Sequence, residues 1–338
     1  MEQEAEREAA TGPSAGARSS RSAWWVLLGI VLGVLLPAFS CVVLSGFSFF
    51  SLAAVLAGGD SFGGIGPAVA IIRVEGIIVA DDDPTAGAAS GVIIEELERA
   101  AADPTVQAIV LRVDSPGGTV TGSAQIYEAI VELEKPVVVS MGATAASGGY
   151  YISAPADVIV ARPDTITGSI GVIYTLFNVE ELLDELGVDV MTIASGPNKD
   201  LGSLWEDPTE EEVAIFASLV EESFERFVEI IAAGRAELDE AEVRELADGR
   251  IYSGRQALAL GLVDELGNLD EAIEIAAELG GIEGKPRIVE YERIPSFGML
   301  FSSFLGQLTR TEADRLIETV NVFAAPTLQY RYMGPGLE

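Results

Sequence analysis

From Pro67 onward, short apolar runs rich in β-branched residues alternate with segments of helical periodicity, and this alternation constrains the fold more than any other feature. The runs that predict strands are Ala68–Val74, Ala108–Val113, Val137–Met141, Val158–Ala161, Val188–Ile193 and Pro286–Tyr291. The helical patterns are Gly91–Ala102, Thr121–Glu134, Asn178–Leu186, Thr209–Ala233, Glu240–Ala247, Gly254–Leu260 and Asp270–Leu279. Apolar strands separated by helices are typical of a layered α/β core with buried, mainly parallel strands.

An uncharged run of 38 residues, Ser22–Gly59, precedes this core. Its first part, Ala23–Leu44, is long enough to span a bilayer as a helix. Arg18 and Arg21 stand before it, so the positive-inside rule places the N-terminus in the cytoplasm and the main domain outside. We therefore predict a single-pass protein of the cell membrane, with a transmembrane anchor and apolar extension over residues 23–58.

Three alternatives to this anchor remain open. The run could be a buried core helix or a cleaved signal peptide. Val42–Gly59 could also return across the bilayer after a turn at Pro37, which would leave the catalytic domain in the cytoplasm.

The polar residues 1–22 predict a disordered tail. Residues 66–292 form the predicted main domain, and residues 293–338 are predicted to pack on it or on a neighbouring subunit.

Composition excludes several kinds of active site. The chain has no histidine, which excludes a Ser-His-Asp triad, a Cys-His dyad and any metal site built on imidazole. Its single cysteine, Cys41, excludes an intrachain disulfide and a thiolate zinc cluster. We expect no metal and no organic cofactor.

The formal net charge is −33, from 53 acidic and 20 basic residues. Such a charge disfavours nucleic acid as a partner, because binding phosphates requires Lys and Arg to displace counterions. Repulsion between like charges would destabilise a compact chain unless salt screens it, and the Debye length falls to about 3 Å near 1 M salt. The composition therefore favours a halophilic source over an ordinary protein with an acidic tail, since no long single-sign block appears.

Three glycine-containing turns stand out as candidate sites. Asp114–Gly118 follows one predicted strand, Ala145–Tyr151 follows another, and Thr167–Val172 comes shortly after a third. Glycines let backbone N–H groups approach a ligand, and a serine at a strand-to-helix turn stands where those groups favour an oxyanion. Each motif alone is also explained as a tight turn, and Ser147 and Ser169 are equally plausible nucleophiles on this evidence.

A serine needs a base, and without histidine the base can be a lysine whose pKa burial lowers. The chain has only three lysines. Lys135 and Lys285 each precede a proline at the start of a predicted strand, which indicates solvated edge charges. Lys199 lies in the turn Ser195–Asp200, after the predicted strand Val188–Ile193, and is the favoured base, with an ordinary surface lysine as the alternative.

Taken together, the turns resemble the signal peptide peptidase A family, membrane-anchored serine–lysine peptidases of the ClpP/crotonase fold. The matching stretches are Arg112–Gly118, Ala145–Tyr151, Thr167–Ile173, Ser195–Asp200, Asp248–Arg255 and Leu262–Gly267. Their order and spacing across residues 66–292 are far more specific than any single motif. The resemblance implies a ClpP/crotonase-like α/β fold with repeated ββα units.

The resemblance also assigns roles to residues. It implies that Ser147 is the nucleophile and Lys199 the general base, 52 positions apart, so that they meet in the fold or between subunits. It implies an oxyanion hole from the backbone N–H groups of Gly148 and of the Gly117–Gly118 loop. Ser169 would orient the lysine amine, with a capping turn residue as the alternative.

The implied function is hydrolysis of peptides through an acyl-enzyme, with remnant signal peptides as substrates, by a homo-oligomer at the membrane. Two alternatives remain: an acyl-CoA enzyme of the crotonase type and a non-catalytic membrane scaffold with the same fold. The scarcity of basic residues argues against a coenzyme A phosphate site.

Overall fold

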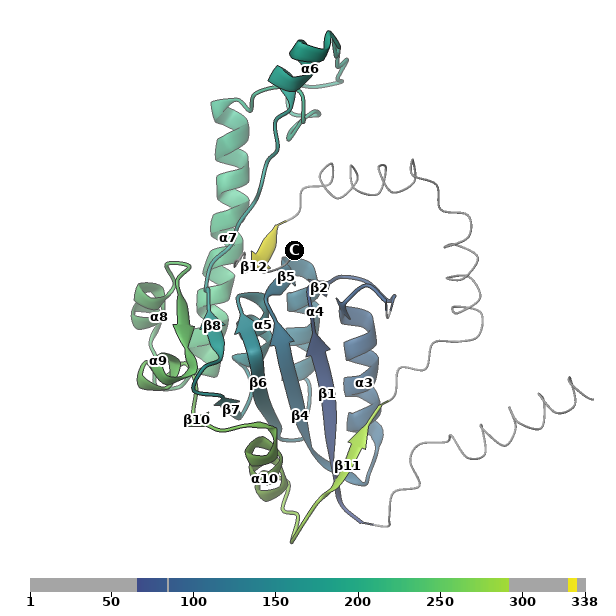
Figure 1. Ribbon diagram of the computed structural model, residues 1–338, viewed down its shortest axis with the longest axis vertical. Helices are drawn as coiled ribbons and strands as arrows, with labels where there is room; N and C mark the ends of the chain where they lie inside the picture. Colours follow the sequence, from purple (N-terminus) through teal and green to yellow (C-terminus); the bar gives the residue numbers. More distant parts are fainter. Residues whose placement is uncertain (1–65, 84, 292–327, 333–338) are drawn as a thin grey trace, which may run out of the picture. The chain divides into compact units, whose positions relative to one another are not determined.

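A computed structural model describes residues 66–83, 85–291 and 328–332, and its central element is a parallel sheet (Figure 1). The strands follow the order β10-β7-β6-β4-β1-β11, and each pair of neighbours is parallel. Their bounds are Ala68–Glu75 for β1, Val106–Ser115 for β4, Val137–Ala146 for β6, Val158–Ala161 for β7, Glu265–Leu266 for β10 and Arg287–Glu290 for β11. Buried parallel strands need apolar side chains on both faces, and the central runs supply them.

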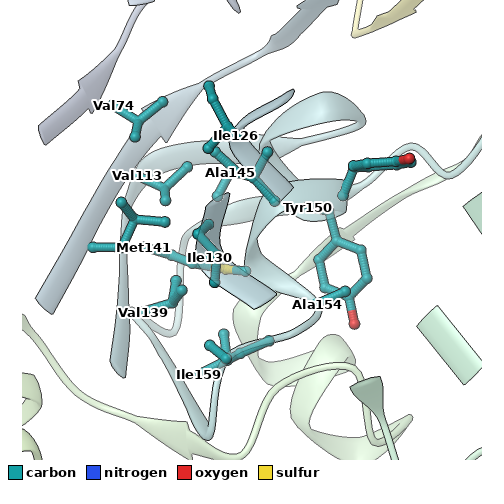
Figure 2. Packing of buried hydrophobic residues seen from close by; sticks show 14 of the residues in the cluster. Val74, Val113, Ile126, Ile130, Val139, Met141, Ala145, Tyr150, Ala154 and Ile159 are labelled. Carbon is teal, nitrogen blue, oxygen red and sulfur yellow. The ribbon is translucent and has the colours of Figure 1, made fainter. Parts of the chain in front are cut away.

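Helices cover both faces of this sheet. On β1, Ile72 and Val74 belong to a core cluster that includes residues of α3 (Ser90–Ala102), α4 (Val120–Val131) and α5 (Gly148–Ser153). Val69 and Ile71, one residue out of step, pack instead with α10 (Leu269–Leu279). Figure 2 shows the first cluster, where side chains of β4 and β6 meet those of α4 and α5. The alternation of side chains along a strand therefore produces a three-layer α/β arrangement.

Short strands lie at the carboxyl ends of the long ones. A small sheet has the order β12-β5-β2-β3, and β8 pairs with β6 on one side and with β9 on the other. Their bounds are Ile78–Val79 for β2, Ala88–Ala89 for β3, Gly117–Thr119 for β5, Ile166–Gly168 for β8, Ile251–Ser253 for β9 and Gln329–Arg331 for β12. The sequence β4-β5-α4 is one ββα unit. The short strands bring several turns together at the carboxyl ends of the main-sheet strands.

The remaining helices are α6 (Glu180–Leu186), α7 (Glu210–Gly234), α8 (Glu240–Leu246) and α9 (Gly254–Ala259). Helices α7 to α10 each begin with a capping box, in which the N-cap side chain and a Glu or Gln three residues later satisfy each other's backbone N–H groups. Carboxylates thus take part in the capping boxes of α7, α8 and α10, whereas α9 uses Ser253 and Gln256.

The predicted α/β class is confirmed, and one predicted strand is wrong. Val188–Ile193 forms no strand and all six residues are exposed, because no segment among the described residues offers them a ladder of hydrogen bonds. Lys135 is also not a solvated edge charge: its Nζ donates to the carbonyl oxygens of Ala100 at 2.8 Å and Asp103 at 2.7 Å. It therefore holds the C-terminus of α3, as a cation does at a helix end.

The predicted tail (1–22) and membrane anchor (23–58) lie outside the described residues. Within 66–83, 85–291 and 328–332, no helix is both long and apolar enough to cross a membrane. Of the predicted packing segment 293–338, the structure describes residues 328–332, where β12 pairs with β5.

Candidate active site

Ser147 lies at the junction of β6 and α5, where it is the N-cap of the helix and only 1% exposed. Its φ is 53°, a left-handed value that few non-glycine residues adopt. Its backbone N–H donates to the carbonyl of Gly168 at 2.7 Å, and its carbonyl accepts from the N–H groups of Tyr150 and Tyr151 at 2.9 Å. The sharp turn is thus fixed by hydrogen bonds on both sides.

Ser169 comes close to Ser147 through strand pairing. Strands β6 and β8 are parallel, with Ala146 opposite Gly168, so the two serines follow neighbouring strand ends. Ser169 is 8% exposed, has a φ of 50°, and its N–H donates to the carbonyl of Arg250 at 2.8 Å. The structure therefore brings the two candidate serines together at the carboxyl ends of neighbouring strands.

Gly117 and Gly148 touch one another across the site. A Cβ added to Gly117 would lie 2.6 Å from the backbone nitrogen of Gly148, and Gly117 has a φ of 91°. A Cβ added to Gly148 would lie 3.1 Å from the Gly117 Cα. Both positions need glycine because the turn before α4 and the start of α5 approach more closely than any side chain allows. The two glycine turns therefore meet at one place, where the Gly117 N–H donates to the Ser115 hydroxyl at 3.0 Å.

Gly118 lies in the middle of the small sheet. It pairs with Ile78 of β2 on one side and with Tyr330 of β12 on the other. The carbonyl oxygen of Tyr330 lies 2.0 Å from the position of a Cβ on Gly117, so the backbone of β12 runs directly over the glycine turn. The backbone N–H of Tyr332 donates to the Pro116 carbonyl at 2.7 Å and continues this pairing.

The side chain of Tyr330 is fully buried beside the site. Its ring stacks on Tyr151 with centroids 4.8 Å apart and packs on Phe227 at the same distance, and its hydroxyl donates to the Ser223 carbonyl at 2.8 Å. Burial raises the pKa of Tyr151 to about 12 and also raises those of Tyr150 and Tyr330. These phenols are therefore structural, neutral groups.

Polar contacts hold the strand ends that carry the turns. Asp114 accepts the backbone N–H of Thr144 at 3.0 Å, and Arg112 donates to the Ser140 hydroxyl at 2.9 Å and the Met141 carbonyl at 3.0 Å. Desolvation lowers the pKa of Arg112, although nearby Asp114 opposes this shift. β4 and β6 are thus tied together just where the backbone turns into the site.

Lys199 is not brought to Ser147 within the described chain. It is exposed and lies in a turn where its N–H donates to the Gly196 carbonyl at 3.2 Å. No residue between 174 and 209 is buried, and this segment packs on the N-terminal half of α7, where Tyr174 stacks on Phe216. Helix α5 contacts the other half, at Phe227, about 16 Å further along at 1.5 Å per residue.

Two features of the site were not predicted from the sequence. The segment that contains Tyr330 and β12 was expected to pack on the main domain or on a neighbouring subunit. Its partner strand could not be predicted, because three residues are too few to show a periodic pattern. Ser123, a buried serine whose hydroxyl lies 2.6 Å from the Cβ position of Gly148, gave no signal among the many serines of the chain.

Comparison with known proteins finds similar sequences over the region that contains these residues. The model of peptidase family S49 matches residues 129–283, which include Ser147, Ser169 and Lys199, and the Clp protease model matches residues 70–162. A proposed protease of Synechocystis is 46% identical over 189 residues, which cover 55% of this chain and 67% of that protein.

Two further relatives carry more specific names. A proposed signal peptide peptidase, SppA, of Enterococcus faecium is 37% identical, over 71% of this chain and 73% of its own length. Protease 4 of Salmonella typhi is also 37% identical, over 64% of this chain but only 35% of that longer protein. A relative with this identity along most of its length shares the fold and the family, and the chain belongs to peptidase family S49, together with the SppA and protease 4 proteins.

Proposed function

We propose that the chain is a serine endopeptidase with Ser147 as nucleophile and Lys199 as general base. The observation that carries this proposal is the glycine turn beside Ser147. There Gly117 and Gly148 approach each other too closely for either to carry a side chain, and the extended strand β12 runs across Gly117. A buried serine beside converging backbone amides is suited to acyl transfer, in which the amides stabilise a developing oxyanion.

The pairing of β12 with β5 supports a peptide as the substrate. An extended peptide can bind by adding a strand to an exposed edge, so that main-chain hydrogen bonds supply affinity whatever the sequence. Residues 329–331 do this antiparallel to Gly117–Thr119, with Tyr330 opposite Gly118. A substrate on the same path would carry a backbone carbonyl past the turn that begins at Ser147.

The proposed reaction has two halves. Neutral Lys199 removes the hydroxyl proton as the Ser147 oxygen attacks the carbonyl carbon, and the carbonyl oxygen becomes an oxyanion held by the N–H groups of Gly148 and the Gly117–Gly118 loop. The C–N bond then breaks and the lysine gives its proton to the leaving amine. Water attacks the resulting ester and its proton passes to the same lysine. The bond between the acyl carbon and the Ser147 oxygen then breaks, the lysine returns the proton to that oxygen, and the acid product leaves. Ser169 orients the lysine amine.

We further propose that the lysine comes from a second copy of the chain. Lys199 is exposed, and its segment displays apolar side chains to solvent, Met191 being 85% and Ile193 90% exposed. A soluble surface rarely carries such a stretch unless it contacts a partner. A homo-oligomer would bury this segment, and a lysine amine desolvated at such a contact is more readily neutral.

The sequence and the names of the relatives support a proposed location and a proposed substrate class. The uncharged run over residues 23–58 supports a membrane anchor with the catalytic domain on the extracytoplasmic side. The name of the Enterococcus relative supports signal peptides as the substrate class. Peptides released beside the membrane would meet an anchored enzyme there.

Substitution of each proposed residue tests the reaction. Ser147→Ala and Lys199→Ala should each reduce hydrolysis of an unstructured peptide to background, and a fluorophosphonate should label wild-type Ser147 but not Ser147→Ala. Ser218→Ala and Lys285→Ala alter exposed residues of the same types outside the site and should remain active. Full activity of either site variant would refute the proposal.

Mixing the two inactive variants tests the shared site. If each site combines Ser147 from one chain with Lys199 from another, co-assembled Ser147→Ala and Lys199→Ala chains regain part of the wild-type activity. Two variants of one chain-internal dyad would stay inactive at every mixing ratio.

A further inference from the structure

Ser123 carries a buried hydroxyl that the proposed mechanism does not use. It lies in the first turns of α4, is 0% exposed, and its Oγ has no hydrogen-bond partner. Among the described residues it is the only serine or threonine hydroxyl that is buried without one. A buried polar group left without a partner costs stability, so its presence needs an explanation.

Other buried hydroxyls of the molecule show the ordinary arrangement. Ser153, on α5, donates back to the Gly149 carbonyl at 2.6 Å, as helical serines usually do. Ser90 donates to Gln125 at 2.7 Å, and Thr167 donates to the Ala145 carbonyl at 2.7 Å. Ser123 sits four residues after Thr119 and could bond its carbonyl in the same way, but its hydroxyl does not.

The hydroxyl is instead directed toward the catalytic turn. Its Oγ lies 2.6 Å from the position that a Cβ on Gly148 would occupy, and Gly148 follows the proposed nucleophile. The carbonyl oxygen of Tyr330 lies 3.1 Å from that same position, and so does the Gly117 Cα. The hydroxyl, the glycine turn and a backbone carbonyl of an extended segment therefore surround one point.

We propose that Ser123 is a catalytic residue, a side-chain donor that completes the oxyanion hole. This inference rests on the proposed peptidase function of Ser147. When the oxyanion forms, the Ser123 hydroxyl donates to it alongside the N–H groups of Gly148 and the Gly117–Gly118 loop. A donor without a partner in the resting enzyme gains its hydrogen bond only as the charge develops, and such an interaction lowers the barrier without tightening substrate binding.

The test compares Ser123→Ala with Ser90→Ala in the full-length protein. Loss of one oxyanion donor commonly lowers kcat by about 100- to 1000-fold, and with two backbone donors remaining we expect a fall of at least about 10-fold. KM for the peptide should stay within about twofold of wild type, and the melting temperature should be unchanged or higher because no hydrogen bond is lost. Ser90→Ala loses a hydrogen bond to Gln125 that involves neither glycine turn, so it should lower the melting temperature and leave kcat unchanged.

A peptide aldehyde provides the second readout. Its adduct with Ser147 is tetrahedral and carries an oxygen in the oxyanion position, so its inhibition constant should rise in Ser123→Ala in proportion to the fall in kcat. A purely structural serine would not produce this parallel change. Unchanged kcat, or a loss explained by KM or by unfolding, would overturn the role of Ser123.

The two proposals fail in different ways. If wild-type protein neither cleaves peptide nor reacts with a fluorophosphonate at Ser147, the peptidase function itself is wrong. If the wild type does both and Ser123→Ala matches it, only the third donor is wrong.

Discussion

At the scale of single residues, the site consists of hydroxyl groups held in unusual places. Ser147 and Ser169 lie close together because each follows the carboxyl end of one of two paired strands, β6 and β8. The sequence alone could not choose between them as nucleophile, since both occupy glycine-rich turns. The resemblance to a peptidase family made the choice, and the geometry adds that only Ser147 begins a helix against Gly117.

Ser169→Ala should slow peptide hydrolysis by about 10-fold or more while leaving the nucleophile in place. The expected reason is loss of a hydroxyl that orients the base, and positioned proton transfer contributes about 100- to 10,000-fold in total. The measurement is kcat together with the rate of fluorophosphonate labelling at Ser147, which should persist at a reduced rate. Complete loss of labelling would mean that Ser169 has a different role.

The three lysines show where residue-level reasoning ends. Proximity to proline suggested that Lys135 was solvated, but its amine binds two carbonyls at the end of α3. Those carbonyls come from residues 32 and 35 positions earlier in the chain. No local pattern reveals such a contact, because it depends on how the loop between α4 and β6 lies against the end of α3.

At the scale of elements, long periodic segments were predictable and short ones were not. The strand predicted over Val158–Ala161 and the helix predicted over Asp270–Leu279 match β7 and α10 nearly residue for residue. Strands of two or three residues, such as β5 and β12, are too short to show alternation. Val188–Ile193 has the composition of a strand but no partner strand in the described part of the chain, so composition alone does not determine strand pairing.

Removal of β12 should expose the edge of β5 on which we propose that the substrate binds. Truncation after Thr327 deletes the segment paired with Gly117–Thr119, so we expect KM for a peptide to fall and labelling of Ser147 to accelerate. Loss of the buried Tyr330 ring should also destabilise the fold by about 3–5 kcal/mol, as for other buried aromatic residues. Assays therefore belong well below the melting temperature of the variant.

Truncation after Tyr332 is the matched control for this experiment. It keeps β12 and should leave KM and stability at wild-type values. An unchanged or higher KM in the longer truncation would identify β12 as part of the wall of the site and not as a competitor of the substrate.

The aromatic cluster should make the fold sensitive to alkali. Burial raises the pKa of Tyr151 to about 12, from the usual 10.0, and also raises those of Tyr150 and Tyr330. Unfolded tyrosines lose their protons at lower pH than these folded ones. The stability from this source is therefore complete below pH 10 and is lost as pH rises toward 12.

Thermal unfolding as a function of pH, with tyrosinate absorbance followed in parallel, measures this effect. Tyr151→Phe should flatten the decline, since it removes one titrating group and keeps the ring. An equally steep decline in the variant would show that other groups control alkaline unfolding.

At the scale of the whole molecule, the charge of −33 should make stability depend on salt. Carboxylates far outnumber basic residues, so most repulsion between them is relieved only by screening. We expect the melting temperature to rise by several degrees or more between about 0.1 M and 2 M KCl. Sucrose provides the control, because it stabilises folded proteins without screening charge. Equal effects of the two additives, or no response to KCl, would contradict the halophilic interpretation.

The left-handed backbone of Ser147 and Ser169 has a consequence for the molecule as a whole. Among the described residues these two are the only ones other than glycine with positive φ, and such conformations typically cost about 1–3 kcal/mol each. Glycine would relieve that strain, so Ser147→Gly and Ser169→Gly should yield an inactive or slow protein that is harder to unfold. If both substitutions stabilise the fold and lower activity, the two serines are kept in a strained conformation because the proposed site needs their hydroxyl groups.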